Sequence, residues 1–509
     1  MPTPDFAQLS LQHLQAVVAI DSASDERSQS IPTTPGQTRL ADHLAEFFGG
    51  IAGVQVERDA FSNVICSLPG RGAGADKAPV ALMIHLDTAR GTHPVTSLAV
   101  TGPWEGGPVP YPKAVDLQVD IASYPSLSQY KGHRLVHGPG DAPFGLDDKL
   151  GLAHAMTLFK ALEAMPEIEH PPLIFVGRPD EEVGRTEALI ALSKTLAERG
   201  VKLGYTLDGL DPFEVNVENF DAAGAWIRFV GDGSVHPGQG FTLRLGGVNT
   251  HGATAKAEGH RSALRFAVEI QQRCKEEGVS AHFSSFVSNP ERDCDAVCIL
   301  AVQPADEDRL WEIARQVVSP HRSRGASVEL AMGGDPPPEH GVAQALDWIA
   351  AFYASDPGFV LWAEESDGRQ GYTAAYRALP HGPSGLQVDL RIRDFGEDRR
   401  KARIEHIERM AGDQPWEWTL QYDNMGRHLA DCPELVDHAM AAAQAAGVQA
   451  KVQPIRGGTG IDPFLSEGVM VANLGTGYFA PESEKELTSL ETMAGHARWL
   501  LALVQELAR

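Results

Sequence analysis

The sequence has few cysteines and no long apolar stretch, and each shortage excludes a class of protein. Its 509 residues include only five cysteines, an odd number scattered along the chain at positions 66, 274, 294, 298 and 432. Such cysteines do not make a disulfide framework and fit a reducing compartment. No stretch approaches ~18 uninterrupted apolar residues, and the N-terminus has no basic segment followed by an apolar one. We therefore expect a soluble protein of the cytoplasm that does not span a membrane.

Basic residues are also in short supply. The chain has 43 Lys and Arg against 68 Asp and Glu, a formal net charge of −25. Nucleic acids and anionic membranes both require a basic surface, so neither is an expected partner. With 43% hydrophobic residues the chain can bury a full core. Its length exceeds what one core usually serves, which predicts two domains or one domain with an insertion.

What the sequence does have is a set of candidate metal ligands placed directly after apolar, strand-like runs. Three runs are followed in this way: 80–84 by His85 and Asp87, 173–177 by Asp180-Glu181-Glu182, and 203–207 by Asp208. In an α/β sheet, ligands collect at such strand ends. Carboxylates with one imidazole are the donors that hold two divalent ions for hydrolysis, while a further carboxylate accepts a proton from water.

The same periodicities predict the fold. Helices expected at 6–20, 38–48, 150–164 and 186–198 alternate with strands, which is typical of a mostly parallel sheet. After Asp208 the pattern changes, because three strands alternate polar and apolar residues as antiparallel strands with one wet face do, at 226–230, 241–245 and 387–394. From about residue 425 the α/β pattern returns, with helices at 433–446 and 490–508 around a strand at 468–474.

We therefore predict an α/β protein in two domains. A mostly parallel mixed sheet flanked by helices forms a discontinuous first domain, residues 1–222 and 425–509. An inserted α+β domain spans residues 223–424 and is enlarged around 279–385.

Short motifs along most of the chain add a family resemblance. They are ThrProGlyGln at 34–37, HisLeuAspThr at 85–88, GlyLeuAspAspLysLeuGly at 145–151, ProAspGluGluValGly at 179–184, TyrThrLeuAspGly at 205–209, ValGluAsnPheAspAlaAla at 217–223, ThrHisGlyAlaThrAlaLys at 250–256, IleArgAspPhe at 392–395, AspAsnMet at 423–425 and ArgGlyGlyThr at 456–459. Each is weak alone, but in this order they resemble the M20 metallopeptidases and, within them, the peptidase T group of tripeptide aminopeptidases. The first domain then corresponds to the catalytic domain, with a zinc-peptidase-like fold, and the insertion to a lid.

The resemblance implies a role for each residue of the acidic set. His85 and Asp208 are expected to ligate one metal ion, and Asp147 to bridge both ions, since its spacing to Lys149 favours it over Asp148. Glu181 resembles the general base and Glu182 a ligand of the second ion. Asp87 is expected to hydrogen-bond the imidazole of His85 and to fix its tautomer.

One ligand departs from the family pattern. The family completes the second metal site with a His four residues before a Glu, and alignment on Glu486 and Leu490-Glu491 puts Glu482 at that position. A site of Asp147, Glu182 and Glu482 is all oxygen, which favours Mn²⁺ or Mg²⁺, whereas Zn²⁺ is expected beside His85. The alternative is a slipped loop and a half-built second site. Glu484 and Lys485 are expected to face solvent.

Five further residues are candidates for contact with the substrate or with its oxyanion. Arg456 resembles the residue that grips a substrate carboxylate, although the family continues with Asp-Gly where this chain has Gly460-Ile461. For the lid histidine that steadies the oxyanion, His251 is favoured over His236 because the family-like ThrAlaLys follows it. Arg393 and Asn424 complete the set, although Arg393 could equally serve an ion pair on the sheet surface and Asn424 could be an ordinary turn residue.

The resemblance thus implies a two-metal aminopeptidase that hydrolyses short peptides, with an inserted domain of the kind that often mediates homodimers. Two alternatives stay open. One is a hydrolase of another amide or of N-acyl amino acids on the same site. The other is a metal- or peptide-binding homologue that lost turnover with the change to Glu482.

Overall fold

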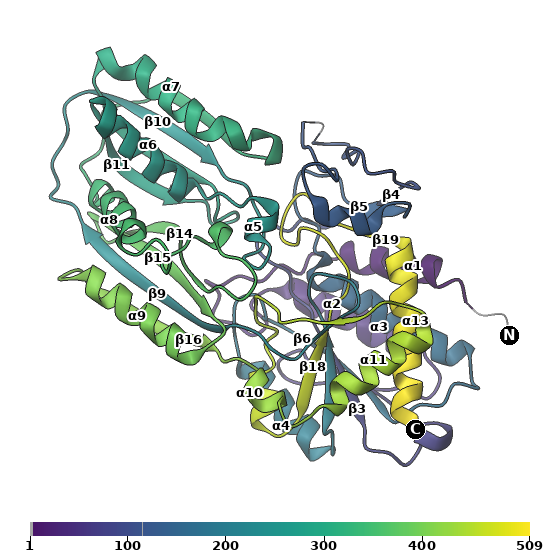
Figure 1. The fold of residues 1–509 in the computed structure, drawn as a ribbon. Helices are drawn as coiled ribbons and strands as arrows, with labels where there is room; N and C mark the ends of the chain where they lie inside the picture. Colours follow the sequence, from purple (N-terminus) through teal and green to yellow (C-terminus); the bar gives the residue numbers. More distant parts are fainter. Residues whose placement is uncertain (1–3, 115) are drawn as a thin grey trace. The chain divides into compact units, whose positions relative to one another are not determined.

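The structure, a computed structural model, describes residues 4–114 and 116–509, so the first three residues of the predicted catalytic domain and Val115 lie outside it. The chain forms two compact units, each around its own hydrophobic core (Figure 1). Unit 1 comprises residues 1–115, 119–219 and 424–509, and unit 2 comprises residues 116–118 and 220–423. Apart from residues 116–118, the chain leaves unit 1 after Asn219 and returns to it at Asn424.

Unit 1 is built on an eight-stranded mixed sheet. In spatial order the strands are β1 (Gln55–Arg58), β2 (Val64–Leu68), β6 (Leu173–Arg178), β3 (Val80–His85), β7 (Leu203–Leu207), β18 (Met470–Leu474), β8 (Glu214–Asn216) and β17 (Lys451–Val452). The central strands β6, β3, β7 and β18 are parallel, and the pairings of β2 with β6 and of β8 with β18 are antiparallel. A mostly parallel mixed sheet was predicted, and this part of the prediction is confirmed.

Helices with apolar stripes pack on this sheet. Four of them contact one another: α1 (Phe6–Val18), α3 (Leu146–Ala164), α11 (Glu434–Ala446) and α13 (Leu490–Ala508). The others in unit 1 are α2 (Pro35–Gly49), α4 (Glu187–Glu198), α10 (Gly426–Leu429) and α12 (Asp462–Ser466). The start of α13 is fixed by Ser489, whose hydroxyl accepts the N–H of Thr492, as an N-cap does.

The segment between β3 and α3 contributes to a second, smaller sheet. Its strands β4 (Ala99–Thr101) and β5 (Leu135–His137) are joined by β19 (Leu487–Ser489) in the order β19-β5-β4. Short 3₁₀ turns lie at Gly72–Gly74 and Pro125–Tyr130. Because β19 comes from the C-terminal part of the chain and begins five residues after Glu482, this sheet anchors the segment that follows Glu482.

Unit 2 contains two sheets of four strands that repeat one topology. The first sheet has the order β11-β12-β10-β13, and the second has the order β14-β15-β9-β16. Read in chain order, each is a strand, a helix, two strands, a helix and a strand, which is the split βαβ arrangement. The first set is β10 (Gln239–Gly246), α6 (Ala263–Glu277), β11 (Ala281–Ser288), β12 (Ala296–Val302), α7 (Glu307–Val318) and β13 (Ser327–Met332). The second is β9 (Asp221–Val230), α8 (Val342–Ser355), β14 (Tyr372–His381), β15 (Gly385–Asp394), α9 (Glu397–Ala411) and β16 (Trp416–Tyr422).

The first set is inserted between β9 and α8 of the second. The edge strands β11 and β14 contact each other, and the N–H of Ala378 donates to the hydroxyl of Ser288 across them at 3.0 Å. The enlargement expected around 279–385 thus contains the strands and helix from β11 to β13 of the first set, followed by α8 and β14 of the second. The short helix α5 (Ala255–Glu258) precedes α6, and short 3₁₀ turns lie at Pro304–Asp306, Ser319–Arg324 and Ala363–Glu365. Among the described residues, no helix combines the length and apolarity that a membrane crossing needs.

Candidate metal centre

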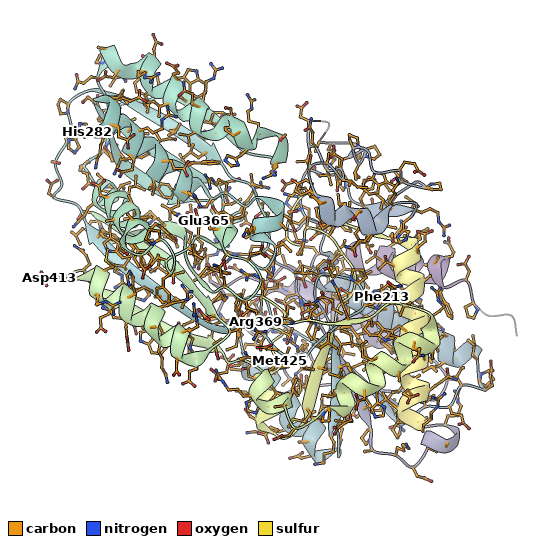
Figure 2. All side chains as sticks on the ribbon, viewed as in Figure 1. Phe213, His282, Glu365, Arg369, Asp413 and Met425 are labelled. Atoms are coloured by element: carbon orange, nitrogen blue, oxygen red, sulfur yellow. The ribbon has the colours of Figure 1, made fainter. Side chains whose placement is uncertain are left out.

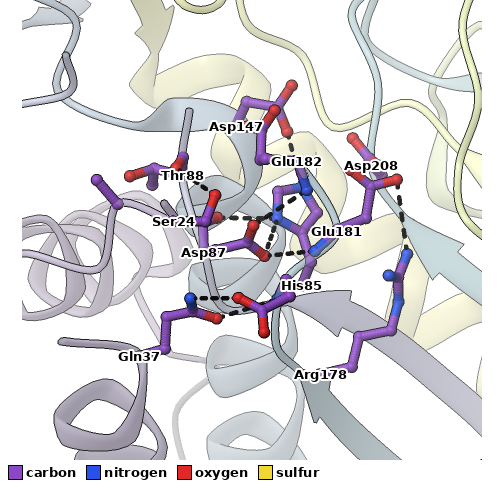
Figure 3. A network of polar contacts seen from close by, with 12 residues as sticks. Ser24, Gln37, His85, Asp87, Thr88, Asp147, Arg178, Glu181, Glu182 and Asp208 are labelled. Atoms are coloured by element: carbon purple, nitrogen blue, oxygen red, sulfur yellow. Dashed lines mark hydrogen bonds and ion pairs between the residues drawn. The ribbon is translucent and has the colours of Figure 1, made fainter. Parts of the chain in front are cut away.

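The candidate ligands gather where neighbouring strands of unit 1 end. Strands β6, β3 and β7 are adjacent and parallel, so their carboxyl ends meet at one edge of the sheet. His85 is the last residue of β3, Asp208 follows β7, and the turn with Glu181 and Glu182 follows β6. Asp147 reaches the same place from the start of α3, as Figure 3 shows.

The donor atoms form two overlapping sets. The ligand atoms of His85, Asp147 and Asp208 all lie within 4.8 Å of one another, and those of Asp147, Glu182 and Glu482 do so as well. We call the first set the imidazole pocket and the second the carboxylate pocket. Asp147 belongs to both, in the position expected of a bridging ligand. These are the two sets that the resemblance implies, and their role as metal ligands stays a prediction.

The ring of His85 is oriented from behind by Asp87. Its Nδ1 lies 2.9 Å from the backbone oxygen of Asp87 and 3.5 Å from the carboxylate, while Nε2 faces Asp147 at 3.0 Å. A proton on Nδ1, donated to the backbone oxygen, leaves Nε2 available as a donor atom. The Asp87 carboxylate accepts the backbone N–H groups of Glu181 at 2.9 Å and Glu182 at 3.0 Å. Asp87 therefore positions three of the predicted site residues.

Asp148 and Lys149 lie behind Asp147. The side chain of Asp148 is buried, and its Oδ1 accepts the N–H of Gly151 at 3.3 Å. Lys149 is buried as well and donates to the backbone oxygen of Ile20 at 2.6 Å; burial lowers the pKa of its amine to about 8. Neither belongs to a donor set, so the geometry agrees with the preference for Asp147.

The carboxylates of the site are crowded together in a buried place, where bound positive charge would stabilise their ionised forms. Burial, together with the neighbouring carboxylates, raises the pKa of Asp208 to about 8 and that of Glu182 well above its usual value. Burial also raises the pKa of Glu181. Burial alone would lower the pKa of His85, but hydrogen bonds with Asp147 and Asp87 raise it well above the usual value. Oε1 of Glu182 is buried and has no hydrogen-bond partner among the described residues. Raised carboxylate pKa values and an unpartnered buried oxygen are typical of residues that bind cations.

The buried carboxylate of Glu486, which in the sequence served only to align Glu482, binds the loops that carry ligands of both pockets. Oε2 of Glu486 accepts the backbone N–H groups of residues 144, 145 and 146 at 2.8, 2.9 and 3.3 Å, just before Asp147. Its Oε1 accepts the N–H of Glu482 at 3.0 Å. Burial raises the pKa of Glu486 to about 7 despite these four donors. Glu482 has a φ of +57°, a strained conformation for a residue with a side chain, so Glu486 holds it where it is.

The expectation that Glu484 and Lys485 face solvent is wrong. Lys485 is fully buried and Glu484 is 8% exposed. The backbone oxygen of Lys485 accepts the hydroxyl of Tyr111 at 2.7 Å, and Nζ lies 3.5 Å from Glu484. The strand β19 begins two residues after Lys485 and pairs with β5. A run of charged residues gave no sign of that burial, because such runs are usually solvated.

Asp180 is turned away from both pockets. Its φ is +61°, and its carboxylate accepts the N–H and hydroxyl of Thr33 and the side-chain amide of Gln37. The turn that carries Glu181 and Glu182 is thereby tied to the start of α2. The ThrProGlyGln motif therefore has a structural explanation: it supports this turn.

A tyrosine absent from the predicted set lies beside the imidazole pocket. The hydroxyl of Tyr478 is 3.5 Å from Oδ1 of Asp208, and the side-chain amide of Asn473 donates to the backbone oxygen of Asp208 at 2.6 Å. Both come from β18 or the segment just after it, which runs beside β7. No motif marked these residues; only the adjacency of β18 and β7 reveals them.

The predicted substrate residues of unit 1 are in loops. Arg456 is half-buried in the turn that follows β17. Oδ1 of Asn424 accepts the N–H groups of Asn219 at 3.3 Å and Gly426 at 2.8 Å. Asn219 and Asn424 are the unit 1 residues on either side of residues 220–423, so the first of these bonds joins the two ends of that insertion.

The other three candidates belong to unit 2. His251 is half-buried, and its Nδ1 accepts the N–H of Ala253 at 3.2 Å. The ring of His236 stacks on that of His282, which Figure 2 labels, at 4.2 Å between centroids. Arg393 donates to the backbone oxygens of Ala223 and Ile392 and to Gln421, so its guanidinium is bound to its own sheet. Their predicted contact with substrate stays a prediction.

The fold defined by unit 1 and unit 2 is that of the M20 metallopeptidases. The aminopeptidase PepT from Bacillus cereus matches 99% of this chain and 99% of its own with a TM-score of 0.51 at 15% identity. Human carnosine dipeptidase 1 matches 100% of both chains with a TM-score of 0.52 at 13% identity. At such identities the likeness concerns the fold alone. No family model matches the sequence.

Within that fold the sequence is similar to proteins named Peptidase T. The Geobacillus sp. (strain WCH70) protein is 32% identical over 229 residues, 45% of this chain and 54% of the relative. The chain thus spans about half the length of this relative. The Geobacillus thermodenitrificans protein is 26% identical over 511 residues, 97% of each chain. The predicted resemblance to M20 metallopeptidases of the peptidase T kind is confirmed.

Proposed function

We propose that this protein is a metal-dependent peptidase that hydrolyses short peptides, with a tripeptide-type aminopeptidase as the specific form. The observation that supports it best is the pair of donor sets that share Asp147 at the end of a parallel sheet. The peptidase T relatives support the substrate class. A cytoplasmic location and a homodimer are parts of the same proposal.

The donor sets fit divalent ions. Burial and the neighbouring carboxylates raise the pKa of Glu182, and one of its buried oxygens has no hydrogen-bond partner within the described part of the chain. Bound cations would stabilise both. His85, Asp147 and Asp208 would hold one ion, and the nitrogen donor suits Zn²⁺. Asp147, Glu182 and Glu482 would hold the other, and oxygen donors alone suit Mn²⁺ or Mg²⁺.

The chain's own residues divide the remaining tasks. When bound, the ions would supply Lewis-acid activation of a water molecule and of the scissile carbonyl. Glu181 belongs to neither donor set, so its carboxylate can act as the general base. It accepts a proton from that water and later donates the proton to the leaving amine. Asp87 keeps Glu181 at the site by accepting its backbone N–H. Arg456 would bind the carboxylate of the substrate.

Release of free amino acids from a panel of di- and tripeptides, with Mn²⁺, Zn²⁺ or Co²⁺ added, tests the proposal. We expect turnover of peptides with a free amino terminus. N-acyl amino acids in the same panel distinguish the alternative hydrolase. A protein that binds two ions but cleaves nothing in the panel would be the binding homologue instead.

A substitution of the base separates catalysis from metal binding. Glu181→Ala should lower turnover by about 10³-fold, as removal of a general base does, while two ions remain bound. Elemental analysis of the same preparation gives the ion content. Turnover close to wild type would show that another group is the base.

A further inference from the structure

A buried arginine lies behind Glu181. Arg178 ends β6, is 2% exposed, and is drawn in Figure 3 next to the acidic cluster. Its Nη2 lies 3.9 Å from Oε1 of Glu181, within ion-pair distance. No motif included it, and neither donor set contains it. A buried guanidinium needs a counter-charge and hydrogen-bond acceptors, and Glu181 supplies the counter-charge of Arg178.

The same nitrogen also holds the turn that carries Arg456. Nη2 of Arg178 donates to the backbone oxygen of Thr459 at 2.8 Å. A guanidinium can serve a carbonyl and a carboxylate together because its N–H groups form a rigid planar fork, which the ammonium of a lysine lacks. Arg178 thereby connects the predicted base with the 456–460 turn.

Gly460 is the residue that makes room for this arrangement. A Cβ at position 460 would lie 2.8 Å from Nη2 and 3.0 Å from Nη1 of Arg178, and 3.1 Å from Oε1 of Glu181. The φ of Gly460 is +58°, which also favours glycine. A side chain at position 460, such as the Asp of the family pattern, would collide with Arg178. The change from the family's Asp to Gly460 is therefore explained by the presence of Arg178.

We propose that Arg178 is a positioning residue that holds the carboxylate of Glu181 in place for proton transfer, and that Gly460 is required to accommodate it. The proposal rests on the proposed function, because Glu181 is the base only in that function. Arg178 does not touch substrate in this role; it acts through Glu181.

The first test compares Arg178→Gln and Arg178→Lys with wild type on one tripeptide. A displaced base should lower kcat about 10²-fold in Arg178→Gln, since a shift of about 1 Å has that effect. KM should stay within about threefold and metal content should not change, because substrate and ion contacts are intact. Arg178→Lys should recover part of kcat. Unchanged kcat, or a loss of metal equal to the loss of kcat, would overturn the proposal.

Arg71→Gln is the matched arginine control. Arg71 also donates to backbone oxygens, those of Leu162 and Met165, but it lies in a loop away from both pockets. Its loss should leave kcat unchanged. An equal fall in Arg71→Gln would mean that any such arginine acts through stability alone, against the proposal.

The second test uses two glycines. Gly460→Ala and Gly447→Ala both put a methyl group on a residue with positive φ, +58° and +68°, but a Cβ at Gly447 meets nothing within 4 Å. Only Gly460→Ala should lower kcat. In an Arg178→Gln background Gly460→Ala should add little, because the contact it disturbs is gone. Losses that multiply would show that Gly460 acts independently and would refute its assigned part.

Crystal structures keep this proposal apart from the proposed function. If wild type cleaves no peptide with any metal, the proposed function fails, but the position of the Glu181 carboxylate can still be compared between wild type and Arg178→Gln. Movement of that carboxylate by about 1 Å or more supports a positioning role. An unmoved carboxylate overturns it.

Discussion

The two pockets share one ligand and otherwise differ in how the chain builds them. The imidazole pocket takes His85 and Asp208 from the ends of adjacent parallel strands, and both are buried. The carboxylate pocket takes Glu182 and Glu482 from turns, and all its ligands are half-buried. A strand end has few ways to move, whereas Glu482 stays at a strained φ only through the bonds around it. The imidazole pocket should therefore be the tighter and more rigid site.

Loss of the shared ligand should have the largest effect. Asp147→Asn removes a charge from both pockets while preserving shape, so we expect both ions to bind weakly and turnover to fall by 10³-fold or more, about 4 kcal/mol. Elemental analysis and steady-state kinetics on one preparation measure both.

Asp148→Asn is the natural control for this substitution. Asp148 is the adjacent carboxylate, but its side chain points to Gly151 instead of into a pocket. We expect Asp148→Asn to keep two ions. If it loses them and Asp147→Asn does not, the bridging role belongs to Asp148.

Removing one ligand from each pocket should separate the two sites. His85→Ala and Glu482→Ala should each lower the ion content by about one equivalent. The affinity at that site should fall by more than the ~10–10²-fold that loss of a group supporting a ligand costs. The fall in affinity should be greater for His85→Ala, because the imidazole is buried and supplies the nitrogen donor of its set.

Exposed Glu467 supplies the matched control on the carboxylate side, and Glu467→Ala should bind two ions. An unchanged stoichiometry in Glu482→Ala would show that the alignment on Glu486 chose the wrong residue. The half-built second site would then be the better description.

The difference between the pockets also explains how far the sequence could be interpreted. Strand ends are marked by apolar runs, so His85, Asp208 and the Glu181-Glu182 pair could be selected from pattern alone, and the parallel sheet that joins them is confirmed. Glu482 came only from alignment, because no periodicity marks a turn. The burial of Lys485 was missed for a related reason: it contacts Tyr111, which lies far away in the sequence.

Contacts between residues far apart in the sequence could not be predicted either. Arg178 meets Thr459, and Glu486 meets residues 144–146, through loops whose conformations no local pattern specifies. The repeated topology of the two sheets in unit 2 was not predicted from the sequence. One set interrupts the other after β9, so equivalent strands are unevenly spaced along the chain.

The pH dependence of stability should differ between chelated and metal-loaded protein. Asp208 has a pKa raised to about 8 in the folded chain from 3.8. Its contribution is fully present below about pH 4 and is lost as pH rises through about 8, at a cost of a few kcal/mol with EDTA present. Buried His13 and His154 act in the opposite sense. Their pKa values are lowered to about 4 from 6.5, so their contribution is present above pH 6.5 and is lost as pH falls to about 4.

Chelated protein should therefore melt at its highest temperature near pH 6, and bound ions should stabilise it most at pH 8, where they meet deprotonated ligands. Thermal melts from pH 4 to 9, with EDTA and with Mn²⁺, measure the difference. Asp208→Asn should flatten the alkaline side of the EDTA curve. A melting temperature with EDTA that keeps rising between pH 6 and 9 would contradict the raised pKa of Asp208.

The smallest expected effect tests the chemical difference between the pockets directly. Glu482→His gives the carboxylate pocket an imidazole, so its preference should shift from Mn²⁺ toward Zn²⁺ by about tenfold, or about 1.4 kcal/mol. Competition between the two metals, followed by elemental analysis, measures that shift, and Glu482→Gln controls for loss of charge. The imidazole pocket should keep its own preference, because Asp147 is the only ligand that the pockets share. A shift that appears in both pockets would mean that Asp147 transmits the change and that the two sites bind as one unit.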